Sequence, residues 1–235
     1  MYSYALLLLA VIDAGLLVWS VRAWLGDRRN NALLLQTILL LLLWFDVLTV
    51  AVGSWVGAGP TLELMSRIRY TWFYLTMPLL LIGVGALARQ ANFAWAKPKW
   101  VIALICIAAS YFIVRDVPRV LVAEFQLACF ADTVRHVGTV AIGEACPGGV
   151  EGAGKWFPSL SIPIVFLSVT LMGVLLWVRR GWPWLAVSAI LFMASTAIPS
   201  AIVGPFLTYP LDALMTAAFV VTAMKFKPGL ESANT

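Results

Sequence analysis

The sequence is poor in charged residues and contains a single histidine. Asp, Glu, Lys and Arg make up 11% of its 235 residues, whereas 62% are hydrophobic, and the mean hydropathy is +0.94. A soluble domain carries about 25% charged residues. A chain this apolar therefore needs lipid as part of its solvent. The composition excludes a water-soluble globular protein and predicts one membrane domain over residues 1–235.

The scarcity of histidine excludes several kinds of membrane chemistry. His136 is the only histidine and lies outside the apolar runs, so two histidines for a haem are absent. The sequence has no HExxH motif for catalytic zinc. It also has no phosphate-binding glycine loop and no lysine in the middle of its last apolar run, where a retinal Schiff base would form. We therefore expect a protein with no catalytic residue, no metal site and no cofactor.

Seven apolar runs have about the length of a membrane span. A spanning helix needs about 20 apolar residues, because the hydrocarbon is ~30 Å thick and each residue rises ~1.5 Å. The expected spans cover about residues 3–24, 32–56, from within 62–70 to 89, 100–114, 160–178, 184–203 and 211–226. The fourth and the seventh are the shortest. The sequence thus predicts an all-α membrane protein, a bundle of seven transmembrane helices.

The positive residues predict how this bundle is oriented. Lysine and arginine accumulate after the first, third, fifth and seventh expected spans: Arg22, Arg28, Arg29, Arg89, Lys97, Lys99, Arg179, Arg180, Lys225 and Lys227. Short loops rich in lysine and arginine stay in the cytoplasm. We therefore expect the N-terminus outside and the C-terminus in the cytoplasm, in a bacterial inner membrane. These residues also account for the net charge of +5 without nucleic acid as a partner.

The longest predicted connection, about residues 115–158, would lie outside the cell. It contains Cys129 and Cys146, two of the three cysteines. Disulfides persist outside the cytoplasm, so we expect these two to be bonded. The segment from Val117 to Ala131 is apolar enough to predict an amphipathic helix, and the glycine-rich segment 147–154 predicts a loop.

Ionisable residues inside the expected spans are the candidate site residues, because charge is costly in hydrocarbon. They are Asp13, Asp46, Glu63, Arg67, Arg69 and Asp212. All but Asp13 fall in the outer half of the expected bundle. Glu63 and Arg67 are four residues apart and share a helix face, which favours an ion pair. One interpretation is an outward-facing pocket for a small ligand or a partner's polar group. The other is a structural network, for example an ion pair between Asp46 and Arg69.

Part of the sequence resembles a known family. The stretch RYTWFYLTMP at residues 69–78 is followed by an apolar run, Arg89 and an aromatic-basic turn at residues 95–100. This pattern resembles the seven-helix sensor region found N-terminal to some bacterial histidine kinases and cyclic-nucleotide signalling enzymes. The YPLD stretch at residues 209–212 is similar to the last helix of that region. The resemblance covers about half of the chain and implies a seven-helix sensor with its N-terminus outside.

Three functional hypotheses follow. Members of that family continue into a kinase or cyclase domain, whereas this sequence ends shortly after Phe226. The first hypothesis is therefore a sensor-like or receptor-like module that acts through a partner protein. The second is an accessory subunit of a large respiratory or photosynthetic complex. The third is a small transporter, which the intramembrane carboxylates favour and the absence of an internal repeat disfavours. The expected partners are membrane lipid and one or more membrane proteins.

Overall fold

The computed structural model describes residues 1–155, 159–198 and 207–227, which are mostly helical. Within these residues the α-helices are α1 (Tyr2–Gly26), α2 (Asn31–Val56), α3 (Pro60–Gln90), α4 (Lys99–Leu121), α5 (Ser161–Arg180), α6 (Trp184–Thr196) and α8 (Thr208–Lys225). A short 3-10 helix, η1 (Ala94–Ala96), precedes α4, and two strands, β1 (Gln126–Phe130) and β2 (Thr133–Val137), lie between α4 and α5.

Five of the described helices, α1 to α5, are long and apolar enough to cross a membrane. The chain is therefore an integral membrane protein whose membrane part is all-α, as its composition predicts. The described part of the sixth expected span is α6, which is shorter. The remainder of that span, from residue 199 to residue 203, lies outside the described residues.

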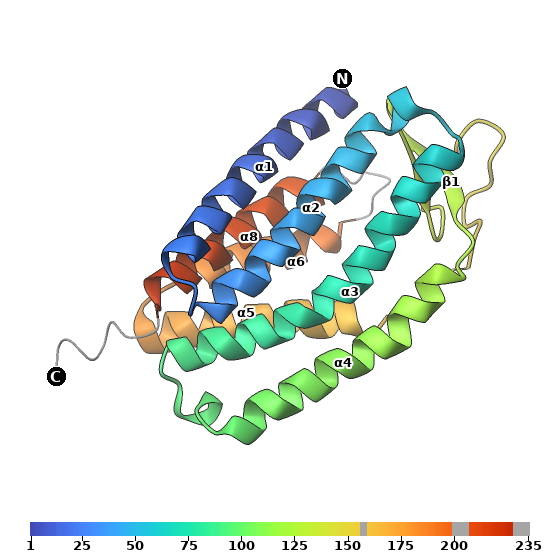
Figure 1. The fold of residues 1–235 in the computed structure, drawn as a ribbon. Helices are drawn as coiled ribbons and strands as arrows, with labels where there is room; N and C mark the ends of the chain where they lie inside the picture. Colours follow the sequence, from blue (N-terminus) through green and yellow to red (C-terminus); the bar gives the residue numbers. More distant parts are fainter. Residues whose placement is uncertain (156–158, 199–206, 228–235) are drawn as a thin grey trace.

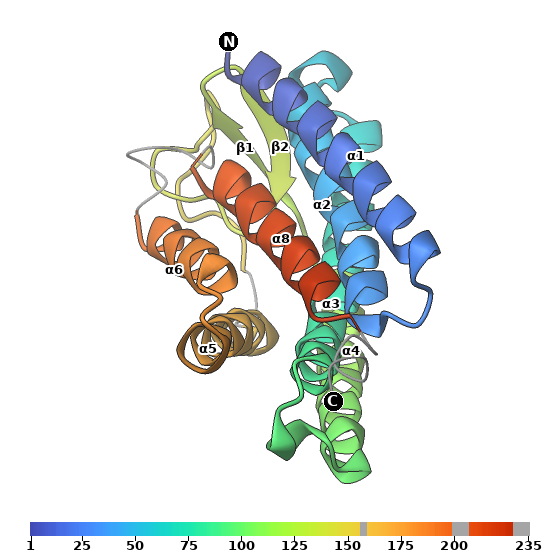
Figure 2. The same ribbon diagram turned by 90° about the vertical axis from the view of Figure 1, so that its left-hand side faces the viewer.

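The helices pack in an order that leaves α4 at the edge. Successive helices α1, α2 and α3 lie side by side, and α8 packs against α1, α2 and α6 (Figures 1 and 2). Helix α5 packs against α3 and α6, whereas the main packing partner of α4 is α3. Pro78 lies inside α3, where a proline removes one backbone hydrogen bond and favours a bend, and the α3 ribbon changes direction between its two ends (Figure 1).

Two apolar clusters fill the bundle. The larger one joins α2, α3, α5, α6 and α8 and contains the buried side chains of Leu39, Met77 and Phe219. The smaller one joins α1, α2 and α8 around Leu6 and Val50. The smaller cluster lies in the half of the bundle near the N-terminus of α1, where the two strands are also found (Figure 2). We call this the hairpin end.

The predicted amphipathic helix over residues 117–131 is wrong. Helix α4 continues to Leu121, and the chain then forms an antiparallel hairpin in which Gln126 pairs with Val137 and Phe130 with Thr133. In β2 buried and half-buried residues alternate, which is the period of a strand with one face on a core. The apolar content of residues 117–131 is therefore not sufficient to predict their structure, because pairing with β2 and packing on the surface beneath the hairpin determine it.

The hairpin packs directly on α2 and α3. Gly53 of α2 permits this approach: a Cβ atom built on it would lie 1.9 Å from the carbonyl oxygen of Val134 in β2. The hairpin turn reaches α1, where Asp132 accepts hydrogen bonds from the main-chain N–H of Tyr2 (2.7 Å) and of Ser3 (3.4 Å). A carboxylate at a helix N-terminus is favoured by the helix dipole. Three helices thus hold the hairpin in place.

Candidate ligand-binding cavity

A cavity of about 390 Å³ lies where the hairpin meets α2, α3 and the start of α8. This volume is within the range of ~300–1,000 Å³ that is usual for small-molecule sites. Charged and aromatic side chains dominate its wall: Asp46, Arg69, Arg135, Glu144, Tyr70, Phe73 and Tyr209. Two of the predicted site residues, Asp46 and Arg69, therefore line a cavity together.

The first ion pair of the cavity joins α2 to α3. Arg69 Nε lies 3.2 Å from Asp46 Oδ1, and Arg69 Nη2 donates a 3.3 Å hydrogen bond to the main-chain oxygen of His136 in β2. The guanidinium carbon of Arg69 lies 4.5 Å from the centre of the Tyr70 ring. Tyr209, at the start of α8, lines the same cavity wall and interacts electrostatically with the Asp46 carboxylate. One ion pair thus connects α2, α3, β2 and α8.

The second ion pair lies within the hairpin and the loop that follows it. Arg135 Nη2 donates a 2.6 Å hydrogen bond to Glu144 Oε2, and both residues are buried. The main-chain N–H of Cys129 donates to the main-chain oxygen of Glu144 over 2.8 Å. The predicted disulfide between Cys129 and Cys146 is present and joins the same two segments. The strand, the loop and the disulfide therefore position this pair.

Each of the two arginines retains an unused donor. Arg69 is 3% exposed and Arg135 is 6% exposed. Among the described residues, neither Arg69 Nη1 nor Arg135 Nη1 has a hydrogen-bond partner. Buried N–H groups are nearly always paired, because leaving one unpaired costs about 1–3 kcal/mol. Both residues line the same cavity, so an acceptor bound there is the candidate partner for these two donors.

Two further carboxylates form an electrostatic group with Asp46. The carboxylate of Asp212 in α8 is near enough to those of Asp13 and Asp46 for mutual electrostatic repulsion. Asp13 of α1 is only 2% exposed. Oδ1 of Asp13 and Oδ1 of Asp212 have no hydrogen-bond partner in the described part of the chain. Neither residue lines the cavity, so Asp46 is the member of this group that a bound molecule would touch.

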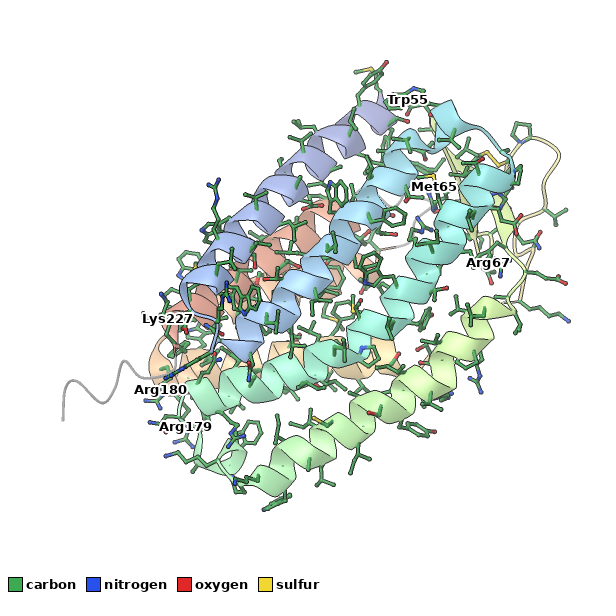
Figure 3. All side chains as sticks on the ribbon, viewed as in Figure 1. Trp55, Met65, Arg67, Arg179, Arg180 and Lys227 are labelled. Carbon is green, nitrogen blue, oxygen red and sulfur yellow. A yellow bond between two sulfur atoms is a disulfide. The ribbon has the colours of Figure 1, made fainter. Side chains whose placement is uncertain are left out.

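The remaining candidates, Glu63 and Arg67, lie apart from the cavity on the surface of α3. Arg67 Nη2 is 3.2 Å from Glu63 Oε1, and both side chains are partly exposed. Arg67 Nη1 also donates to the main-chain oxygen of Leu121 over 2.9 Å, and its guanidinium carbon lies 5.0 Å from the Phe125 ring centre. These contacts attach the end of α4 and the entry to the hairpin to α3. Figure 3 shows Arg67 at the hairpin end.

His136 lies in β2 between Arg135 and Val137, which line the cavity. Neither ring nitrogen has a hydrogen-bond partner within the described residues. Burial lowers the pKa of His136 from its ordinary value of 6.5, and the charge of Arg69 lowers it further, while Glu63 acts in the opposite direction. The imidazole is therefore held preferentially in its neutral form.

Sequence reasoning did not select Arg135, Glu144 or Tyr209 as site residues. Arg135 and Glu144 are opposite charges between the two cysteines, nine residues apart in the sequence, in a segment expected to be exposed loop. No local spacing rule pairs them, because a hairpin and a disulfide bring them together. Tyr209 is part of the YPLD stretch, in which Asp212 was the candidate because it is the ionisable residue within the expected span.

No group of three or more His, Cys, Asp or Glu side chains in the described residues is arranged to hold a metal ion. The chain matches no protein-family model and none of the curated proteins.

Proposed function

We propose that this chain is a non-enzymatic, sensor-like membrane module that binds a small molecule in the hairpin-end cavity and acts through a partner protein. The observation that carries this proposal is the pair of unused Nη1 donors on Arg69 and Arg135, both buried beside a cavity of about 390 Å³. Ion pairs that serve only to join helices gain nothing from unused buried donors, since each one is a desolvation penalty.

The charges on the cavity wall define the ligand. Two carboxylates, Asp46 and Glu144, balance two guanidinium groups, Arg69 and Arg135, so the wall carries no net charge. A ligand with several negative charges would be repelled by the carboxylates. The ligand that fits is a small, weakly charged molecule with a carboxylate or carbonyl group for the two Nη1 donors and an apolar or planar part for the aromatic wall.

The proposed topology has seven spans, with α6 and α8 in the sixth and seventh. The hairpin end faces outward, and the opposite end faces the cytoplasm of a bacterial cell. The distribution of positive charge supports this orientation. Figure 3 shows Arg179, Arg180 and Lys227 at the end opposite the hairpin. The Cys129–Cys146 disulfide also supports an oxidising compartment for the hairpin.

Helix α8 provides the proposed route from the cavity to the partner. It carries Tyr209 at the cavity and ends at Lys225 on the opposite side. Near that end, Asn30 Nδ2 donates to the main-chain oxygen of Ala223 (2.7 Å), and Trp182 Nε1 donates to Thr222 Oγ1 (2.9 Å). A ligand that moves Tyr209 would therefore shift an element that is hydrogen-bonded to the α1–α2 and α5–α6 connections.

Ligand-induced thermal stabilisation of the purified protein tests the site. We expect a subset of small monocarboxylates, amino acids and ketones to raise the melting temperature, because a ligand that binds only the folded state stabilises it. Arg135→Lys keeps a cation beside Glu144 but removes the forked guanidinium. The variant should therefore need about tenfold more ligand, or still more, to reach the same rise in melting temperature. Arg67→Lys is the matched control, since Arg67 does not line the cavity. A stabilisation that Arg135→Lys leaves intact would place the ligand elsewhere.

Purification from the native membrane in mild detergent tests the partner. A sensor-like module predicts a membrane protein partner whose association changes when a cavity ligand is added or when Tyr209 is replaced by Phe. Mass spectrometry identifies the partner, and an absorption spectrum detects pigment. Stoichiometric association with a pigmented or respiratory complex that is insensitive to Tyr209→Phe would contradict the sensor proposal and favour an accessory subunit.

A further inference from the structure

A second concave surface lies at the opposite side of the bundle, between α4 and α5. An apolar groove of about 550 Å³ runs over α3, whose Leu81, Val84 and Gly85 form its floor. Residues of α4, including Ala108 and Phe112, form one wall, and residues of α5 from Ile164 to Leu175 form the other. The groove exists because α3 is the main packing partner of α4, so that α4 and α5 flank α3 without closing on each other.

The groove continues into a positively charged mouth. A hollow of about 520 Å³ lies at the end of α5 and is lined by Arg179, Arg180, Asn92 and Phe93. Trp95 of η1 and Leu175 of α5 line both the groove and the mouth, so the two hollows adjoin each other. Figure 3 shows Arg179 and Arg180 together at this end of the molecule.

The two arginines differ in how they are held. Arg180 is anchored, because its Nη2 donates a 2.6 Å hydrogen bond to the main-chain oxygen of Ala91 and its guanidinium carbon lies 5.9 Å from the Phe93 ring centre. Arg179 is exposed beside it. Arg180 thus fixes the shape of the mouth, while Arg179 supplies an adaptable charge.

We propose that the groove and its mouth together bind one anionic phospholipid, with an acyl chain along α3, α4 and α5 and the phosphate at Arg179 and Arg180. The length of the groove matches this occupant. From Ile164 to Leu175 a helix rises ~17 Å, which is close to half of a ~30 Å hydrocarbon core and so to one leaflet. Trp95 marks the level of the headgroups, which tryptophan prefers. Basic pockets between transmembrane helices bind acidic headgroups by the same chemistry.

Native mass spectrometry of the detergent-solubilised protein tests the proposal, with dioleoyl phosphatidylglycerol and dioleoyl phosphatidylcholine as probes. We expect the retained adduct to favour phosphatidylglycerol. Arg179→Gln should reduce this preference about fivefold, since one cation near a headgroup contributes about that factor. Arg28→Gln is the matched control, because Arg28 is an exposed arginine in the α1–α2 connection, away from the mouth.

Filling the groove tests the acyl chain. Ala108→Trp should abolish the retained lipid, and Ala103→Trp, an exposed alanine of α4 that does not line the groove, should not. Ser168→Phe fills the groove from the α5 wall and serves if Ala108→Trp does not fold. Equal retention of both lipids, an equal effect of Arg28→Gln, or lipid retention that both groove fillings leave unchanged would each overturn the proposal. A dimer that Ala108→Trp dissociates would do so as well, because a second copy would then occupy the groove.

Discussion

The Arg69 guanidinium of α3 lies 3.2 Å from the Asp46 carboxylate of α2, and the same arginine donates a hydrogen bond to the hairpin. Arg69 is nearly fully buried. Removing one partner of a buried pair leaves an uncompensated charge, so Arg69→Leu should cost about 3–5 kcal/mol in the free energy of unfolding. Denaturation in mixed micelles measures this cost.

The double variant Arg69→Leu with Asp46→Leu distinguishes the ion pair from packing. We expect it to recover most of the lost stability, because neither charge then remains buried alone. The control is Arg67→Leu, whose partly exposed pair with Glu63 should contribute less than about 1 kcal/mol. A double variant as unstable as Arg69→Leu would show that the contacts of the arginine stem, rather than its charge, matter at this position.

Gly53→Ala should displace the hairpin from α2. The added methyl group would meet the carbonyl oxygen of Val134 at 1.9 Å, and main-chain atoms on both sides leave no flexible side chain to move. We expect a loss of about 1–3 kcal/mol and faster proteolysis of the β1–β2 segment. Gly15→Ala in α1 is the matched control, since no side chain and no other element of the described residues comes within 4 Å of its added Cβ. Equal protease resistance of the two variants would contradict the close contact.

Removing the disulfide should loosen the second ion pair of the cavity. The bond between Cys129 and Cys146 closes a loop with a sequence separation of 17, for which chain entropy gives about 3 kcal/mol. We expect Cys129→Ser with Cys146→Ser to lower the melting temperature and to weaken binding of the cavity ligand. Cys106→Ser, at a half-buried position in α4, should change neither. The wild-type protein treated with a reductant should behave like the double variant.

Acidification should destabilise the hairpin through His136. Burial lowers the pKa of this imidazole below its ordinary value of 6.5. The unfolded chain therefore takes up a proton before the folded chain does, and stability falls as the pH decreases through about 6.5. When the pH is lowered from about 7.5 to about 5.5, the melting temperature of the wild type should fall further than that of His136→Gln. Parallel pH profiles of the two proteins would show that His136 does not titrate differently on folding.

The local sequence was sufficient to predict that the fold consists of membrane-spanning helices. Hydrocarbon thickness sets the length of an apolar run, so α1 to α5 were recognisable as spans without knowledge of their neighbours. The ends were less certain: α4 extends seven residues past the expected end at Val114, to Leu121, where arginines had suggested a connection. Helix geometry alone also brought Glu63 and Arg67 to one face.

The sequence by itself determined that this is a membrane protein and that its membrane part is helical. It also determined which acidic and basic residues lie within the expected spans. Only the tertiary structure decided that Asp46 meets Arg69, that Glu144 meets Arg135, and that residues 117–131, expected to form one helix, divide between the end of α4 and the first strand of the hairpin. The physical reason is the range of the interactions. Hydrophobic length and the helix period act within one segment, whereas strand pairing, disulfide closure and charge pairing across a cavity depend on which segments the packed bundle brings together.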